Sequence, residues 1–88
     1  DTLIAYVMVK NNSDKNKRLY SLSVADSDGY NEQLILQSKK PIMSPSWSPD
    51  GQRLAYVSFE KNRSIIYSQE LKSGKRRVVA QYKGINSA

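Results

Sequence analysis

The residues that could bind a metal ion lie together in one short acidic segment, Asp26-Ser27-Asp28-Gly29. Alternating aspartates ahead of a glycine are typical of the start of a calcium loop, in which carboxylate oxygens surround the ion. Such a loop also needs a third oxygen donor and a distant glutamate, but the next residue is Tyr30 and nothing downstream completes the set. A tight turn is therefore the better interpretation, and we expect no metal ion and no cofactor.

Histidine and cysteine are both absent from the 88 residues. Without histidine the chain lacks the usual general base and every Ser-His-Asp or Cys-His catalytic arrangement. Without either residue type, a disulfide framework is excluded and a structural zinc site is not expected. The four glycines do not form a phosphate-binding loop. The sequence therefore predicts a protein without enzymatic activity.

Basic residues outnumber acidic residues by 14 to 8, which gives a formal net charge of +6. They gather in or beside expected turns and are not interleaved with the aromatic platforms that nucleic-acid binding requires. We therefore expect solvated loops and no nucleic-acid binding, although positive charge can steer an acidic protein partner. No apolar run approaches the roughly 18 residues of a membrane span, so membrane insertion is not expected. The basic clusters are Lys10, Lys15, Lys17 and Arg18; Lys39 and Lys40; and Lys72, Lys75, Arg76 and Arg77.

The acidic and basic residues named above must be positioned by short strands joined by tight turns. In the turn Pro49-Asp50-Gly51, proline presets φ, aspartate can hydrogen-bond the backbone ahead of it, and glycine accepts a positive φ. Polar and apolar residues alternate with a period of two on both sides, and no segment of ten or more residues shows helical periodicity with caps. The chain is therefore expected to be all-β. The expected strands are 3–9, 19–25, 33–38, 43–47, 53–60, 64–70 and 77–82.

Much of the chain recurs, which indicates a repeat. Ala5-Tyr6-Val7 matches Ala55-Tyr56-Val57 at an offset of 50 residues, and the offset falls to 44 further on because the first copy has the longer polar loop. A period of about 44 residues with four strands is typical of a β-propeller blade. We therefore expect a first antiparallel blade over residues 1–42, without its leading strand, and a second blade over 43–88 with the start of a third.

Two blades leave apolar faces and strand edges open, because each repeat buries its apolar face against the next. We therefore expect either part of a larger propeller or self-association that completes one. Three copies of a two-bladed chain would give a six-bladed ring, and strand exchange between chains could supply the missing first strand.

A family resemblance is carried by Trp47-Ser48-Pro49-Asp50-Gly51 followed by Leu54-Ala55-Tyr56-Val57. This segment resembles the WD40-like (PD40) repeat of TolB-type β-propellers, and residues 24–31 and 41–47 resemble the first two blades of that family. The resemblance implies part of a six-bladed propeller in a non-enzymatic periplasmic scaffold of the Tol–Pal cell-envelope system. The implied partners are the lipoprotein Pal, other Tol proteins, and colicins, which exploit the same surface.

In such propellers, the loops that precede the innermost strands line one mouth of the central channel. The corresponding segments here are 39–44 and 83–87, and the loop 60–63 should open on the same face. By this resemblance Met43 would offer apolar area, Ser44 hydrogen bonds and Lys40 charge to a partner. The expected partner-binding residues are Lys40, Ile42, Met43, Ser44, Arg63, Ile85 and Asn86.

Two alternatives stay open. Propellers with similar Ser-Pro-Asp-Gly turns gate the active sites of serine peptidases of the prolyl oligopeptidase type, whose catalytic residues lie in a separate α/β-hydrolase domain. Further blades downstream of Ala88 would favour the Tol–Pal scaffold, whereas a Gly-x-Ser-x-Gly nucleophile elbow would favour a peptidase. The other alternative is a propeller module with no defined partner.

Overall fold

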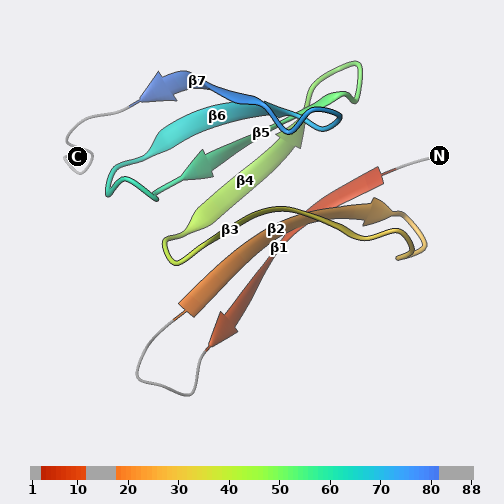
Figure 1. Cartoon of the computed structure of the whole chain (residues 1–88), viewed down its shortest axis with the longest axis horizontal. Coiled ribbons are helices and arrows are strands. Elements are labelled where there is room, and N and C mark those ends of the chain that lie inside the picture. The colour runs from red at the N-terminus through yellow and green to blue at the C-terminus, as the bar shows by residue number, and fades with distance from the viewer. Residues whose placement is uncertain (1–2, 12–17, 82–88) are drawn as a thin grey trace.

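Seven antiparallel strands form two sheets in the computed structural model, which describes residues 3–11 and 18–81 (Figure 1). Sheet A has three strands in the order β1-β2-β3, and sheet B has four strands in the order β4-β5-β6-β7. No helix occurs among the described residues, so none of them forms a membrane-crossing helix. The prediction of an all-β chain is confirmed. The strands are β1 (Leu3–Asn11), β2 (Arg18–Asp26), β3 (Gln33–Ser38), β4 (Ile42–Trp47), β5 (Arg53–Ser58), β6 (Ile65–Glu70) and β7 (Arg76–Gln81).

The observed strand ends lie within two residues of the expected ones. The largest differences are at β1, which continues to Asn11, and at β5, which ends at Ser58 because the backbone of the next two residues finds other partners. Phe59 donates its N–H to the carbonyl oxygen of Pro41 at 3.0 Å, and Glu60 donates its N–H to Ser58 Oγ at 3.1 Å. Tyr82, the expected end of the last strand, lies outside the described residues. The division into blades at residue 42 stays a prediction.

The apolar core lies between the two sheets. Alternate residues of β5 and β6 are buried, as expected for strands with one face on a core. Their register places Tyr56 opposite Tyr67, with ring centroids 5.9 Å apart. Strand β4 contacts β1 and β2 and so joins the sheets. The core residues are Leu22, Val24, Ile42, Leu54, Tyr56, Ile65 and Tyr67.

The turn between β4 and β5 has the chemistry that its sequence predicts. Gly51 adopts a φ of +73°, and its N–H donates to the carbonyl oxygen of Ser48 at 2.9 Å. The carboxylate of Asp50 accepts hydrogen bonds from Ser48 Oγ at 2.6 Å and from the N–H of Gln52 at 3.0 Å. These bonds favour the ionised carboxylate and lower the pKa of Asp50.

Candidate functional site

The acidic segment at residues 26–29 forms a turn between β2 and β3. Gly29 donates its N–H to the carbonyl oxygen of Asp26 at 2.8 Å. The Asp26 carboxylate accepts a hydrogen bond from Asn31 Nδ2 at 2.7 Å, and Asp28 Oδ1 accepts one from the N–H of Tyr30 at 3.2 Å. Both carboxylates therefore serve the turn itself. Within residues 3–11 and 18–81, no group of three potential metal-ligating side chains is placed to hold a metal ion.

Two loops meet at one end of the sheets. The loop from β3 to β4 and the loop from β5 to β6 both lie at the left end of the view (Figure 1). A 3.0 Å hydrogen bond from the Phe59 N–H to the Pro41 carbonyl oxygen joins the two loops. Within the second loop, Asn62 adopts a φ of +64°, and its N–H donates to the carbonyl oxygen of Phe59 at 2.9 Å, which forms a turn. The structure thus brings together two of the three segments that were expected to open on one face; the third, 83–87, lies outside the described residues. We name this region the loop surface; it comprises Lys39, Lys40, Met43, Ser44, Lys61, Asn62 and Arg63.

A bulge in β4 shapes the centre of the loop surface. Met43 pairs with Val57 and Ser46 pairs with Ala55, so Ser44 and Pro45 together lie opposite the single residue Tyr56 of β5. Ser44 has a φ of +53°, which is an uncommon backbone conformation for a residue other than glycine. Met43, opposite Val57, lies on the side of sheet B away from the core and is 48% exposed. Bulges and positive-φ residues are frequent where a strand aims side chains at a partner.

The other residues expected at the site differ in their exposure and in their contacts. Ile42 is 3% exposed and packs in the core, so it anchors the start of β4 and offers a partner no side-chain surface. Lys40 is exposed, and its N–H donates to Ser38 Oγ at 3.0 Å. Arg63 is exposed, and its guanidinium donates to Gln81 Oε1 at 2.9 Å. Ile85 and Asn86 lie outside the described residues.

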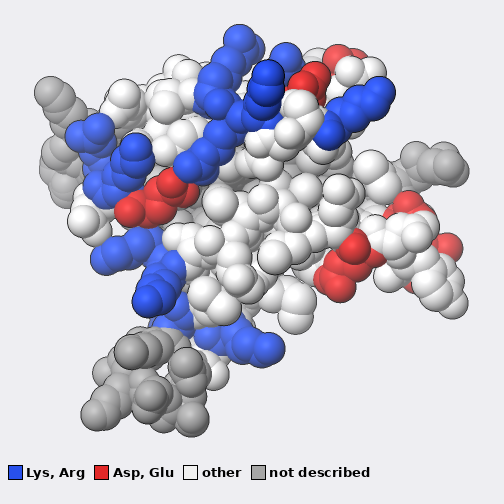
Figure 2. Space-filling view, in the orientation of Figure 1, with Lys and Arg blue, Asp and Glu red and all other residues white. Residues whose placement is uncertain are grey.

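The loop surface is basic. Its four charged residues, Lys39, Lys40, Lys61 and Arg63, are all exposed. Blue side chains accordingly gather at the left end of the molecule (Figure 2). The nearby acidic residue Glu60 already has a cationic partner on β7. This end of the molecule therefore presents net positive charge, which favours an acidic partner.

The partner of Glu60 is Arg76, and the sequence did not reveal this pair. Arg76 Nη2 lies 2.6 Å from Glu60 Oε2, and Arg76 Nη1 lies 3.1 Å from Glu60 Oε1. The guanidinium also stacks 3.9 Å above the centre of the Tyr67 ring and donates to the Tyr56 hydroxyl at 3.2 Å. Sixteen residues separate the two charges along the chain, and Arg76 was grouped with a basic turn. No local pattern could have identified the pair.

These contacts shift the pKa values of three groups. The bidentate bonds from Arg76 lower the pKa of the Glu60 carboxyl. The same bonds raise the pKa of Arg76, which stays protonated at every ordinary pH. Burial raises the pKa of Tyr56, whose hydroxyl donates to Gln69 Oε1 at 2.7 Å. The network therefore holds the β5–β6 loop, and with it the loop surface, against the rest of sheet B.

Comparison with known proteins gives consistent matches over the whole chain. Residues 1–88 match the PD40 family, described as the TolB beta propeller domain. The chain is 61% identical over its full length to the Tol-Pal system protein TolB of Hydrogenovibrio crunogenus. It is 56% identical, over 99% of its length, to the protein of the same name from Nitrosococcus oceani. In both cases it spans 20% of the relative's length.

A solved structure agrees with the sequence relatives. The crystal structure of TolB from Acinetobacter baumannii superposes on 93% of this chain with a TM-score of 0.81 and 45% sequence identity. The matched region is 20% of that chain. The two sheets therefore correspond to about a fifth of a longer propeller protein.

Proposed function

Because this chain belongs to the TolB β-propeller family, we propose that it forms part of a non-enzymatic periplasmic scaffold of the Tol–Pal system and binds the lipoprotein Pal through its loop surface. The relatives above are named as Tol–Pal system proteins and not as enzymes, which agrees with the expected lack of enzymatic activity. Other Tol proteins and colicins are further proposed partners. The observation that carries the proposal is the exposure of Met43 and Ser44 beside two loops that a hydrogen bond joins.

The chemistry of the loop surface suits a protein partner. Exposed Met43 provides a flexible apolar centre, of the kind enriched at the cores of protein interfaces. Ser44 adds a hydroxyl and a strained backbone beside it. Exposed cations surround this centre and would speed the approach of an acidic surface. We therefore propose an apolar contact at Met43 and a salt-dependent rim at Lys39, Lys40 and Lys61.

The absence of cysteine makes a direct test possible, because one introduced thiol is a unique labelling site. We propose Met43→Cys labelled with an environment-sensitive fluorophore and titrated with purified Pal. The matched control is Lys72→Cys, on the exposed turn at the opposite end of sheet B (Figure 1). We expect a saturable change in emission at position 43 and none at position 72. No response at position 43 from a chain with a β-sheet circular dichroism spectrum would contradict the proposal.

The peptidase-gating alternative gains no support from these relatives, whose printed names describe Tol–Pal system proteins.

A further inference from the structure

Two residues of β7, one at each end of the strand, contact the β5–β6 loop, residues 59–64. Arg76 begins β7, and its guanidinium donates two hydrogen bonds to the Glu60 carboxylate, at 2.6 and 3.1 Å. Gln81 ends β7, and its Oε1 accepts a hydrogen bond of 2.9 Å from the Arg63 guanidinium. The end of β7 and this loop both lie at the left of the view (Figure 1). Strand β7 therefore holds the loop near its first and its last residues.

The contact at Glu60 fixes a tight turn. The hydrogen bond from the Asn62 N–H to the Phe59 carbonyl oxygen closes this turn, so Glu60 and Lys61 occupy its two central positions. Buried Ser58 holds Glu60 a second time, because its hydroxyl donates to Glu60 Oε1 at 2.9 Å and accepts from the Glu60 N–H at 3.1 Å. Lys61 thus follows a residue whose backbone and side chain are both held in place.

The two cations of the loop differ in their contacts. Arg63 is exposed, but one of its terminal nitrogens is bonded to Gln81. Lys61 is exposed as well, and within the described part of the chain its amine has no hydrogen bond or ion pair. The Lys61 ammonium group is therefore available to an anionic group of a partner, whereas the Arg63 guanidinium is used in part to hold the loop.

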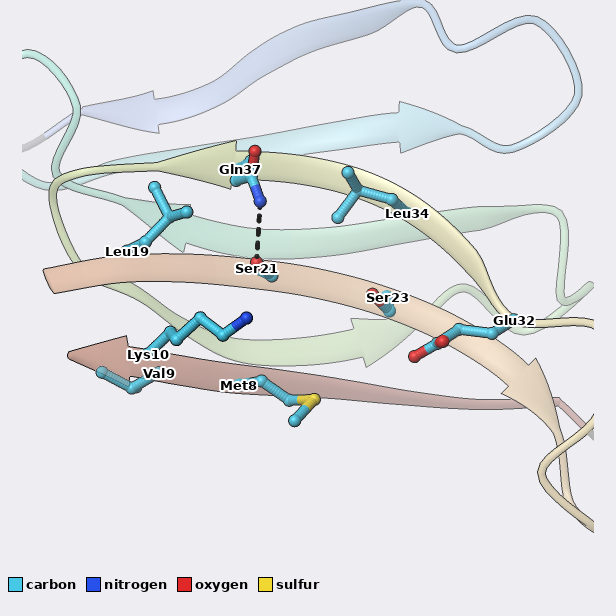
Figure 3. Close-up of a pocket in the computed structure, with 9 residues that line it drawn as sticks. All are labelled: Met8, Val9, Lys10, Leu19, Ser21, Ser23, Glu32, Leu34 and Gln37. Atoms are coloured by element: carbon cyan, nitrogen blue, oxygen red, sulfur yellow. Dashed lines mark hydrogen bonds between the residues drawn. The ribbon is translucent and has the colours of Figure 1, made fainter. Parts of the chain in front are cut away.

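The equivalent positions in sheet A carry the opposite charges. Lys10 lies 50 residues before Glu60, and Glu32 lies 44 residues before Arg76, which are the two offsets of the internal repeat. Figure 3 shows the Lys10 amine and the Glu32 carboxylate apart from one another. Equivalent strand positions with opposite charges are therefore not sufficient for the contact that Arg76 makes.

An aromatic ring explains why the contact forms in sheet B. The Arg76 guanidinium lies 3.9 Å from the centre of the Tyr67 ring, in a cation–π contact. The strand register places Ser23 at the equivalent position of sheet A, where a cation has no ring on which to stack. The Tyr67 ring therefore supports the Arg76 side chain over sheet B, where it reaches Glu60.

We infer that β7 positions the β5–β6 loop for the partner, with Arg76 and Gln81 as positioning residues and Lys61 as the loop's charged contact. This inference rests on the proposed binding of Pal at the loop surface. It also changes the role expected of Arg63, which holds the loop through Gln81 and is not the loop's principal contact. Arg76 and Gln81 touch no partner atom, so their effect on binding passes through Lys61.

Amide exchange measured by NMR tests the positioning of the loop without Pal. Arg76→Lys keeps the charge but cannot form two parallel hydrogen bonds to a carboxylate. We expect the Asn62 amide to exchange about threefold faster in this variant, as befits a partly exposed pair. Arg77→Lys, the same replacement at the exposed neighbour, is the control and should leave the rate unchanged. An unchanged Asn62 rate in Arg76→Lys would overturn the inference, whether or not Pal binds.

Calorimetric titration with Pal then tests how β7 affects binding. At about 0.05 M salt we expect Lys61→Gln to weaken binding about fivefold, and Arg76→Lys and Gln81→Ala about threefold each. The last two replacements leave the net charge unchanged. Because they act through Lys61, their effects should disappear in the Lys61→Gln background and at about 0.5 M salt, where exposed charges are screened. Arg77→Lys should bind Pal as the unaltered chain does.

The possible outcomes separate this inference from the proposed function. No binding of Pal by the unaltered chain would contradict the proposed function and the positioning role together. Pal binding that Arg76→Lys and Gln81→Ala leave unchanged would overturn the positioning role alone. An equal loss of affinity with and without Lys61 would also overturn it, because that result indicates a general structural effect. Tighter binding by Gln81→Ala would show that the released Arg63 is the contact, and would overturn the inference too.

Discussion

A single side chain, that of Arg76, links three parts of sheet B. It forms two charge-assisted hydrogen bonds to Glu60, one to the Tyr56 hydroxyl, and a cation–π contact with Tyr67. Its side chain and that of Glu60 are 29% and 23% exposed, so solvent screens the pair only in part. The main effect of this network is to hold the β5–β6 loop in place, because Glu60 lies at the start of that loop.

Replacement of Glu60 by glutamine should destabilise the chain in a pH-dependent way. Because Arg76 lowers the pKa of Glu60 in the folded state, the stabilisation is present above the ordinary glutamate pKa of about 4.3 and is lost as pH falls through the lower folded value. We expect Glu60→Gln to cost about 0.5–1 kcal/mol at pH 7, near the upper range for partly exposed pairs.

The measurement is urea unfolding of both chains at one protein concentration, at pH 7 and at pH 2.5. The difference between the chains should shrink at the lower pH, because protonation of the Glu60 carboxylate removes its advantage over glutamine. A difference that stays constant with pH would show that the carboxylate charge contributes nothing.

At the scale of whole elements, β5 is central to the stability of sheet B. It lies between β4 and β6, and its buried residues face sheet A. Leu54→Ala should cost about 2–5 kcal/mol, because Leu54 is fully buried and its removal leaves a cavity. Val79→Ala, at a site 58% exposed on β7, is the control and should cost less than about 1 kcal/mol. Denaturant titration compares them, and similar losses for both variants would contradict a core centred on β5.

The elements were largely predictable from the sequence, whereas their contacts were not. Period-two alternation and the Pro-Asp-Gly turn are local signals, so the strands and the turn before Arg53 followed directly. The bulge at Ser44 was not predicted, because the β4 segment contains no glycine, the residue whose presence in a strand often indicates a bulge. The burial of Ile42 was missed because it depends on how β4 lies against β1 and β2. The Glu60–Arg76 pair depends on the packing of β5 and β7 around Tyr67.

At the scale of the whole molecule, the loop surface lies at one end of the strands and is basic. Met43, at its centre, lies opposite Val57 of β5 and so shares the uncovered side of sheet B. The chain spans 20% of its relatives' length, so the partners of the complete proteins remain proposals for this chain.

The most direct test of the central claim is calorimetric titration of Pal into the unaltered chain and into Met43→Glu, with Lys72→Glu as the matched control. We predict measurable binding by the unaltered chain and the control, and at least about tenfold weaker binding by Met43→Glu, because a carboxylate would replace the apolar centre of the loop surface. Equal affinities for Pal in all three chains would contradict the assignment of the loop surface as the partner-binding site.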